Sequence, residues 1–159
     1  MPVVTIRSIP VEFPYEAYSS QLLYMEKVIQ CLQDGSNGLL ESPTGTGKTL
    51  SLLCAALAWR RHEVGKTRGE GGATVVKPRI VYCSRTHAQL SQVVSEMKKT
   101  AYADEVRMTV LGSRNQLCVQ PRVRAIPSGG LQANKCRSMV SNGACGYHHG
   151  VEEAVRRGR

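Results

Sequence analysis

The sequence lacks a long hydrophobic run. Its most apolar stretch, around Leu52–Trp59, is far shorter than the roughly 20 residues that a membrane-spanning helix needs. Its first residues, MPVVTIRSIPVEF, also lack the charged start and apolar core of a secretory signal peptide. We therefore expect no membrane partner and a reducing compartment, the cytosol or the nucleus.

Acidic residues are missing altogether between Glu105 and Glu152. The whole chain has 21 Lys and Arg against 12 Asp and Glu, which gives a formal net charge of +9. The acid-free stretch contains these basic residues: Arg107, Arg114, Arg122, Arg124, Lys135 and Arg137. Such a stretch suits a polyanion such as nucleic acid, and it equally suits a solvated surface whose acidic partners lie elsewhere in the fold. Charge alone does not decide between the two.

No cysteine pair has the C-x-x-C spacing of a zinc ribbon, although the chain contains six cysteines. Without a secretory signal, a disulfide framework is not expected. Three cysteines lie within apolar patterns and are predicted to be buried in the core: Cys31, Cys54 and Cys83. The other three lie in polar, basic surroundings and need another explanation: Cys118, Cys136 and Cys145.

The spacing of apolar residues predicts an α/β fold. It favours an edge hairpin at the start of the chain, followed by helix 21–32, strand 38–42, helix 47–61, strand 78–84, a helix beginning near residue 86 and strand 106–112. Alternating strands and helices indicate a parallel sheet with crossover helices. Residues 62–77 are rich in glycine and charge and are typical of a surface loop. Beyond Cys118 the pattern assigns no elements.

Two capping signals mark predicted helix starts. Thr86 with Gln89, and Ser113 with Gln116, have the spacing of a capping box, in which each partner satisfies a free N–H group of the first turn. Thr86 and Gln89 are equally candidates for contact with a ligand at the end of a strand, and the two roles are compatible.

The strongest motif is ESPTGTGKT at residues 41–49. A predicted strand, a glycine-rich turn and then Lys-Thr at a helix start form the context of a P-loop, in which backbone N–H groups and the helix N-terminus hold phosphates. Lys48 would reach the β- and γ-phosphates, and the Thr49 hydroxyl would bind Mg²⁺. The strict pattern begins with glycine, where this sequence has Ser42. The alternative, a glycine-rich loop without a ligand, is much the weaker interpretation.

Hydrolysis of a bound nucleotide usually needs a further carboxylate after a later strand. Neither of the later predicted strands, IVYCS and MTVLGS, ends in Asp or Glu, so neither supplies such a carboxylate. The sequence therefore predicts nucleotide binding more firmly than turnover.

Together these segments resemble the XPD-type iron–sulfur superfamily 2 DNA helicases. FPYEAYSSQLLYM resembles the adenine-reading Q motif, ESPTGTGKT the Walker A loop, and YCSRTHAQLSQV motif Ia, which faces single-stranded DNA. LGSRNQLCVQP and CGYHHGVEE resemble the iron–sulfur insertion. The resemblance covers nearly the whole chain, with the 62–77 loop as the exception.

The resemblance implies roles for particular residues. ATP and Mg²⁺ would be held by Gln21, at the base edge, and by the loop residues Ser42, Pro43, Thr44, Gly45, Thr46, Gly47, Lys48 and Thr49, of which Lys48 and Thr49 are the catalytic candidates. Single-stranded or branched DNA would contact Arg85, Thr86, His87, Gln89, Arg114, Arg122 and Arg124. Gln21 could also be an ordinary solvated helix residue, and Tyr15 and Tyr18 could pack the adenine pocket or the core.

By the same resemblance, Cys118, Cys136 and Cys145 are three of the four thiolate ligands of a [4Fe–4S] cluster, the fourth lying beyond Arg159. Two alternatives stay open. His148 or His149 could complete a Cys₃His zinc site, or the cysteines could be unrelated thiols.

The resemblance predicts a partial RecA-like P-loop domain with a parallel sheet at residues 1–112, running into an incomplete iron–sulfur insertion at 113–159. It implies part of a nuclear, ATP-dependent DNA helicase of genome maintenance, inactive as an isolated chain. The alternative is a non-catalytic module that binds nucleotide or nucleic acid.

Overall fold

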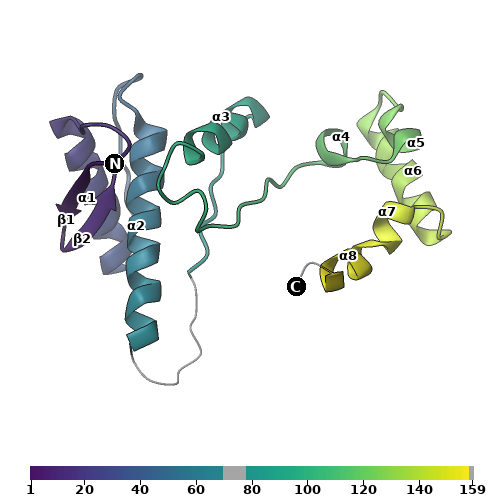
Figure 1. Cartoon of the computed structure of the whole chain (residues 1–159). Helices are drawn as coiled ribbons and strands as arrows, with labels where there is room; N and C mark the ends of the chain where they lie inside the picture. Colours follow the sequence, from purple (N-terminus) through teal and green to yellow (C-terminus); the bar gives the residue numbers. More distant parts are fainter. Residues whose placement is uncertain (70–77, 158–159) are drawn as a thin grey trace. The chain divides into compact units, whose positions relative to one another are not determined.

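The computed structural model describes residues 1–69 and 78–157 (Figure 1). They form two compact units, Met1–Met108 and Thr109–Arg159, which are described separately. Across the described residues, no helix combines the length and apolar character needed to cross a membrane.

The predicted hairpin at the start of the first unit is confirmed. Strand β1 (Val3–Ile6) pairs antiparallel with β2 (Ile9–Glu12), with Ile6 opposite Ile9. Both turn residues adopt positive φ, 48° at Arg7 and 66° at Ser8, a conformation that favours glycine or asparagine. Helix α1 supports this turn from outside, because Arg7 Nε donates to Gln33 Oε1 at 2.7 Å and Gln33 Nε2 donates to the Arg7 carbonyl at 3.2 Å.

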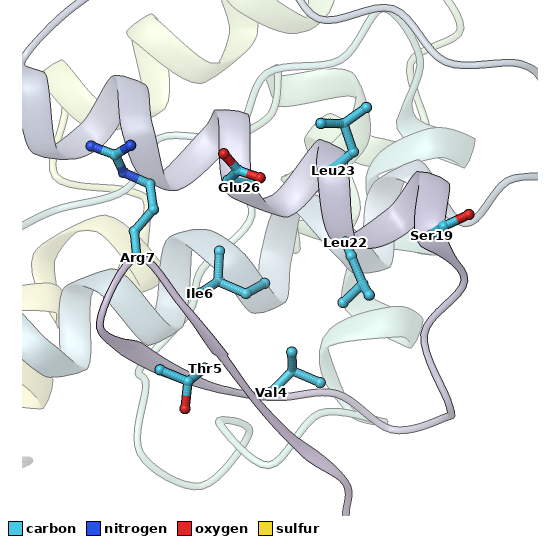
Figure 2. A pocket seen from close by; sticks show the side chains of 8 residues that line it. All are labelled: Val4, Thr5, Ile6, Arg7, Ser19, Leu22, Leu23 and Glu26. Atoms are coloured by element: carbon cyan, nitrogen blue, oxygen red, sulfur yellow. The ribbon is translucent and has the colours of Figure 1, made fainter.

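Two helices pack with the hairpin around the core of the first unit. Helix α1 (Ser19–Asp34) buries the predicted apolar face, and Gly35 ends it in the left-handed conformation at φ 61°. Helix α2 (Lys48–Gly69) buries nearly all of its first half. Within it, burial raises the pKa of the Cys54 thiol to about 12, so this cysteine is an inert part of the core as predicted. Figure 2 shows the shallow hollow between β1 and α1, where Leu22 points toward Val4.

Arg61 ties α2 to two other segments of the first unit. Its guanidinium forms ion pairs with Glu12 on β2 and with Glu105, and lies 4.3 Å from the ring centre of Tyr102. Burial acts to lower the pKa of Arg61, but the hydrogen bonds to the two glutamates outweigh it and the pKa is raised. The Tyr102 hydroxyl accepts the Glu12 N–H at 2.9 Å, and burial raises the pKa of Tyr102 to about 12.

Helix α3 (His87–Met97) begins where the capping signal predicts. Thr86 is its N-cap, and the Thr86 side chain accepts the Gln89 N–H at 3.3 Å. The Gln89 side chain does not close the box; it accepts from Ser84 Oγ at 2.5 Å instead. Val93 and Met97 reach the core of the unit, on the predicted face.

The predicted parallel sheet is not observed in the part of the chain that the structure describes, where β1 and β2 are the only strands. Residues 38–42, 78–84 and 106–112 have no regular structure. Leu39, Val81 and Leu111 are 101%, 82% and 81% exposed. A strand exists only where a neighbour shares its hydrogen bonds, and these apolar segments have none. For the same reason, the prediction that Cys83 is buried is wrong.

The predicted loop at 62–77 is also partly wrong. Helix α2 continues to Gly69, so residues 62–69 are helical. The rest of the predicted loop, residues 70–77, lies outside the described residues.

The second unit consists of helices, of which the sequence pattern predicts only the start of the first and assigns none beyond Cys118. They are α4 (Arg114–Leu117), α5 (Pro121–Arg124), α6 (Gly129–Ser141), α7 (Gly146–His149) and α8 (Val151–Arg157). Local signals start some of them: Pro121 occupies the first position of α5, and the Gln120 side chain accepts the Arg122 N–H. Ser113 precedes α4 as predicted, but its hydroxyl makes no cap bond. A small cluster of Val123, Met139 and Cys145 forms the core.

Candidate nucleotide-binding site

The glycine-rich loop at 42–47 connects an irregular segment to the first turn of α2 (Figure 1). Gly45 and Gly47 have φ of 82° and 74°, which only glycine adopts readily. A Cβ at position 47 would also lie 2.8 Å from Gln21 Nε2 and would displace the end of that side chain. The two glycines therefore set the sharp curve that a P-loop requires.

The start of α2 directs positive potential at this loop. Its first residue is Lys48, its first turn contains no acidic side chain, and Thr49 follows half-buried. The free N–H groups and dipole of a helix N-terminus attract anions. Lys48 Nζ donates to the Ser42 carbonyl, and to the Pro43 carbonyl at 3.2 Å. The ammonium group thus lies within the loop, where a phosphate would meet it.

Two hydroxyl groups bond across the loop. Ser42 Oγ and Thr46 Oγ1 are 2.6 Å apart, and Thr46 Oγ1 donates to the Pro43 carbonyl at 2.9 Å. Sequence reasoning included all three residues in the site but not the bonds between them. The one available signal was Ser42 itself, which stands where the strict pattern has glycine.

Gln21 joins α1 to the loop. Its Nε2 donates to the Thr46 carbonyl at 3.1 Å, and its Oε1 accepts the Tyr18 N–H at 3.0 Å. The side chain is 91% buried in this arrangement, so the solvated-helix alternative is wrong. Both ends of the amide bond the chain's own backbone, and its contact with an adenine edge stays a prediction. Tyr15 and Tyr18 are exposed nearby in the sequence, so neither packs the core.

The residues predicted to contact DNA are all on the surface. Arg85, Thr86, His87 and Gln89 are exposed around the start of α3 in the first unit. Arg114, Arg122 and Arg124 are exposed in the second. The Thr86 side chain caps the helix and the Gln89 side chain accepts from Ser84, which leaves Arg85 and His87 as the freer candidates of that segment. A role in DNA binding stays a prediction for all seven.

The three cysteines of the second unit gather around one small apolar cluster. Cys145 is buried in it, and Cys118 and Cys136 pack against it half-buried. Nevertheless, the described residues contain no group of three or more His, Cys, Asp or Glu placed to hold a metal ion. His148 and His149 contact each other edge to face, 5.3 Å between ring centres. The side chains as they lie therefore fit neither the predicted [4Fe–4S] cluster nor the alternative zinc site.

Comparison with known proteins gives consistent matches. Residues 82–158 match the family model described as DEAD_2. The chain is 44% identical to a regulator of telomere elongation helicase 1 homolog of Drosophila erecta over 182 residues, which covers 96% of this chain and 18% of the relative. It is 41% identical to regulator of telomere elongation helicase 1 of Bos taurus over 181 residues, covering 96% and 15%. The chain spans less than a fifth of the length of either relative. The predicted resemblance is thereby confirmed.

Proposed function

Since this chain belongs to the XPD-type helicase family, we propose that it forms part of the ATP-binding lobe of an ATP-dependent DNA helicase. The observation that carries the proposal is the loop at 42–47, which has the required shape before any ligand is present. Its glycines are in the left-handed region, Lys48 lies inside it, and α2 begins directly behind it. These features suit the phosphates of a nucleotide.

Different groups of the loop contact different parts of Mg·ATP. Backbone N–H groups of 44–49 bind phosphate oxygens, Lys48 exchanges its bonds with loop carbonyls for bonds to the β- and γ-phosphates, and Thr49 binds Mg²⁺ through its hydroxyl. The magnesium ion neutralises phosphate charge when bound. Because no later apolar run ends in a carboxylate, this chain binds Mg·ATP without turning it over.

The DNA partner follows from charge and from the named relatives. The relatives are helicases concerned with telomere elongation, which supports a nuclear protein acting on single-stranded or branched DNA. Exposed arginines at Arg85, Arg114, Arg122 and Arg124 suit phosphate contacts without reading of bases. The alternative is a module that binds nucleotide or DNA without coupling the two.

Two finer parts of the proposal rest on the family rather than on the described geometry. The irregular apolar segments at 38–42, 78–84 and 106–112 become strands of a RecA-like parallel sheet when neighbouring strands are present to pair with them. Cys118, Cys136 and Cys145 come together as cluster ligands only after their side chains rearrange. No step of the proposed function depends on the cluster.

The test is titration of the chain with Mg·ATP by calorimetry, comparing Lys48→Ala with a matched control, Lys66→Ala. Lys66 is also a lysine of α2, but it is exposed and pairs with Glu63 on the same helix. A hydrogen bond to a charged group contributes about 1.5–3 kcal/mol, so Lys48→Ala should weaken binding roughly 10- to 100-fold, and Lys66→Ala should leave it unchanged. Equal affinity of both variants and the parent would overturn the proposal, and hydrolysis that Lys48→Ala abolishes would overturn the absence of turnover.

A further inference from the structure

We propose that Ser42 is a positioning residue: its hydroxyl, bonded to Thr46, holds the phosphate loop in its binding shape. The inference rests on the proposed function and extends it to a residue where the strict P-loop pattern has glycine. Ser42 Oγ lies 2.6 Å from Thr46 Oγ1, four residues further along the loop. A glycine at this position would make no such bond.

The direction of the bond follows from the number of protons. A threonine hydroxyl has one hydrogen, and that of Thr46 is donated to the Pro43 carbonyl at 2.9 Å. The two bonds can exist together only if Thr46 Oγ1 accepts from Ser42, with donation running from Ser42 to Thr46 to Pro43. The same Thr46 accepts from Gln21 Nε2 through its carbonyl at 3.1 Å. The hydroxyl pair is thus linked to α1 as well as to the loop.

The pair becomes more important when a phosphate enters. Lys48 Nζ bonds the carbonyls of Ser42 and Pro43 and so helps to hold the start of the loop against the first turn of α2. Binding of phosphate draws Lys48 away from both carbonyls. The bond from Thr46 to Pro43 and the bond from Ser42 to Thr46 then keep the loop closed. Without the Ser42 hydroxyl, the loop loses this support. The affinity for nucleotide is then lowered, because binding has to order the loop.

The experiment compares Mg·ATP affinity of the 159-residue chain and five variants by calorimetry. Ser42→Ala and Ser42→Gly remove the donor, Thr46→Val removes the acceptor while keeping the shape, and Thr46→Ser keeps the hydroxyl. The double variant, Ser42→Ala with Thr46→Val, tests whether the two side chains affect affinity through the same bond. One neutral hydrogen bond corresponds to a change of roughly 2- to 12-fold in affinity, so we expect each single Ser42 variant to weaken binding by that factor. Thr46→Val also removes the bond to the Pro43 carbonyl and should weaken binding by at least as much. Thr46→Ser, which keeps the hydroxyl, should lose less affinity than Thr46→Val, and the double variant should bind no more weakly than Thr46→Val alone.

Wild-type affinity of Ser42→Ala and Ser42→Gly would overturn the inference, as would fully additive losses in the double variant. Thermal unfolding of each free variant, followed by the fluorescence of Trp59, separates a general loss of stability from a change in the loop. A parallel titration of Lys48→Ala keeps the two proposals apart. If Lys48→Ala weakens binding and Ser42→Ala does not, only the inference fails. If neither does, the proposed nucleotide site fails with it.

Discussion

The two units of this molecule differ in how their structure is stabilised. In the first, the hairpin, α1, α2, α3 and Tyr102 share one continuous core, which includes Ile9, Met25 and Ile29 with almost no exposed surface. In the second, the core is the small cluster of Val123, Met139 and Cys145. Because stabilisation grows with the apolar area buried, the first unit can support itself, whereas the second needs further support such as a ligand or a partner surface.

The difference also separates two kinds of functional candidate. The phosphate loop stands between α1 and α2, and hydrogen bonds from Gln21 and across the loop fix it before nucleotide binds. The cysteines of the second unit share a neighbourhood but have no arrangement that could hold a metal. A site is preformed where the surrounding core is large, and unformed where it is small.

The largest expected effect is on stability, when a buried side chain in the core of either unit is truncated. Ile29 is fully buried in the first unit, and Ile29→Ala should lower the free energy of unfolding by about 2–5 kcal/mol. Met139→Ala, in the small core of the second unit, should leave the unfolding of the first unit unchanged. Trp59 is the only tryptophan and packs against the first core, so its fluorescence during urea denaturation measures that unit specifically. Equal losses in the two variants would show that the units unfold together.

A smaller effect is expected on the salt dependence of DNA binding, when basic side chains of the second unit are replaced. If the second unit contacts DNA phosphates, replacing Arg122 and Arg124 with alanine should reduce the slope of log affinity against log salt by roughly 0.7 per lost contact on single strands. The matched control replaces Lys27 and Lys66, two exposed lysines of the first unit. Fluorescence anisotropy with a labelled single strand at several salt concentrations measures both. The same slope in all three proteins would place the DNA path away from Arg122 and Arg124.

Local sequence signals predicted the parts of the fold that depend on neighbours in sequence. The hairpin, the apolar faces of α1 and α3, the Thr86 cap and the P-loop glycines all follow from spacing and residue type. The strands at 78–84 and 106–112 did not appear, because strand formation depends on a distant partner that periodicity cannot supply. The exposed position of Cys83 has the same cause.

The sequence did not predict the helices of the second unit beyond α4 or the hydrogen bonds within the phosphate loop. Helices α5 to α8 are short or poor in apolar residues, so periodicity does not predict them. Gln120 caps α5 with its side chain, whereas the N-cap residues of α6 and α7 make no side-chain cap bond. The bonds of Gln21 and Ser42 to Thr46 follow from the curve of the loop, which residue types alone do not determine.

The most direct test of a nucleotide site preformed in the first unit is hydrogen exchange of the whole chain with and without Mg·ATP. Slower exchange is predicted for the amides of 44–51 and around Gln21, with no change across 113–157, and Lys48→Ala should abolish the difference. Unchanged exchange at 44–51, or protection confined to 113–157, would contradict the account.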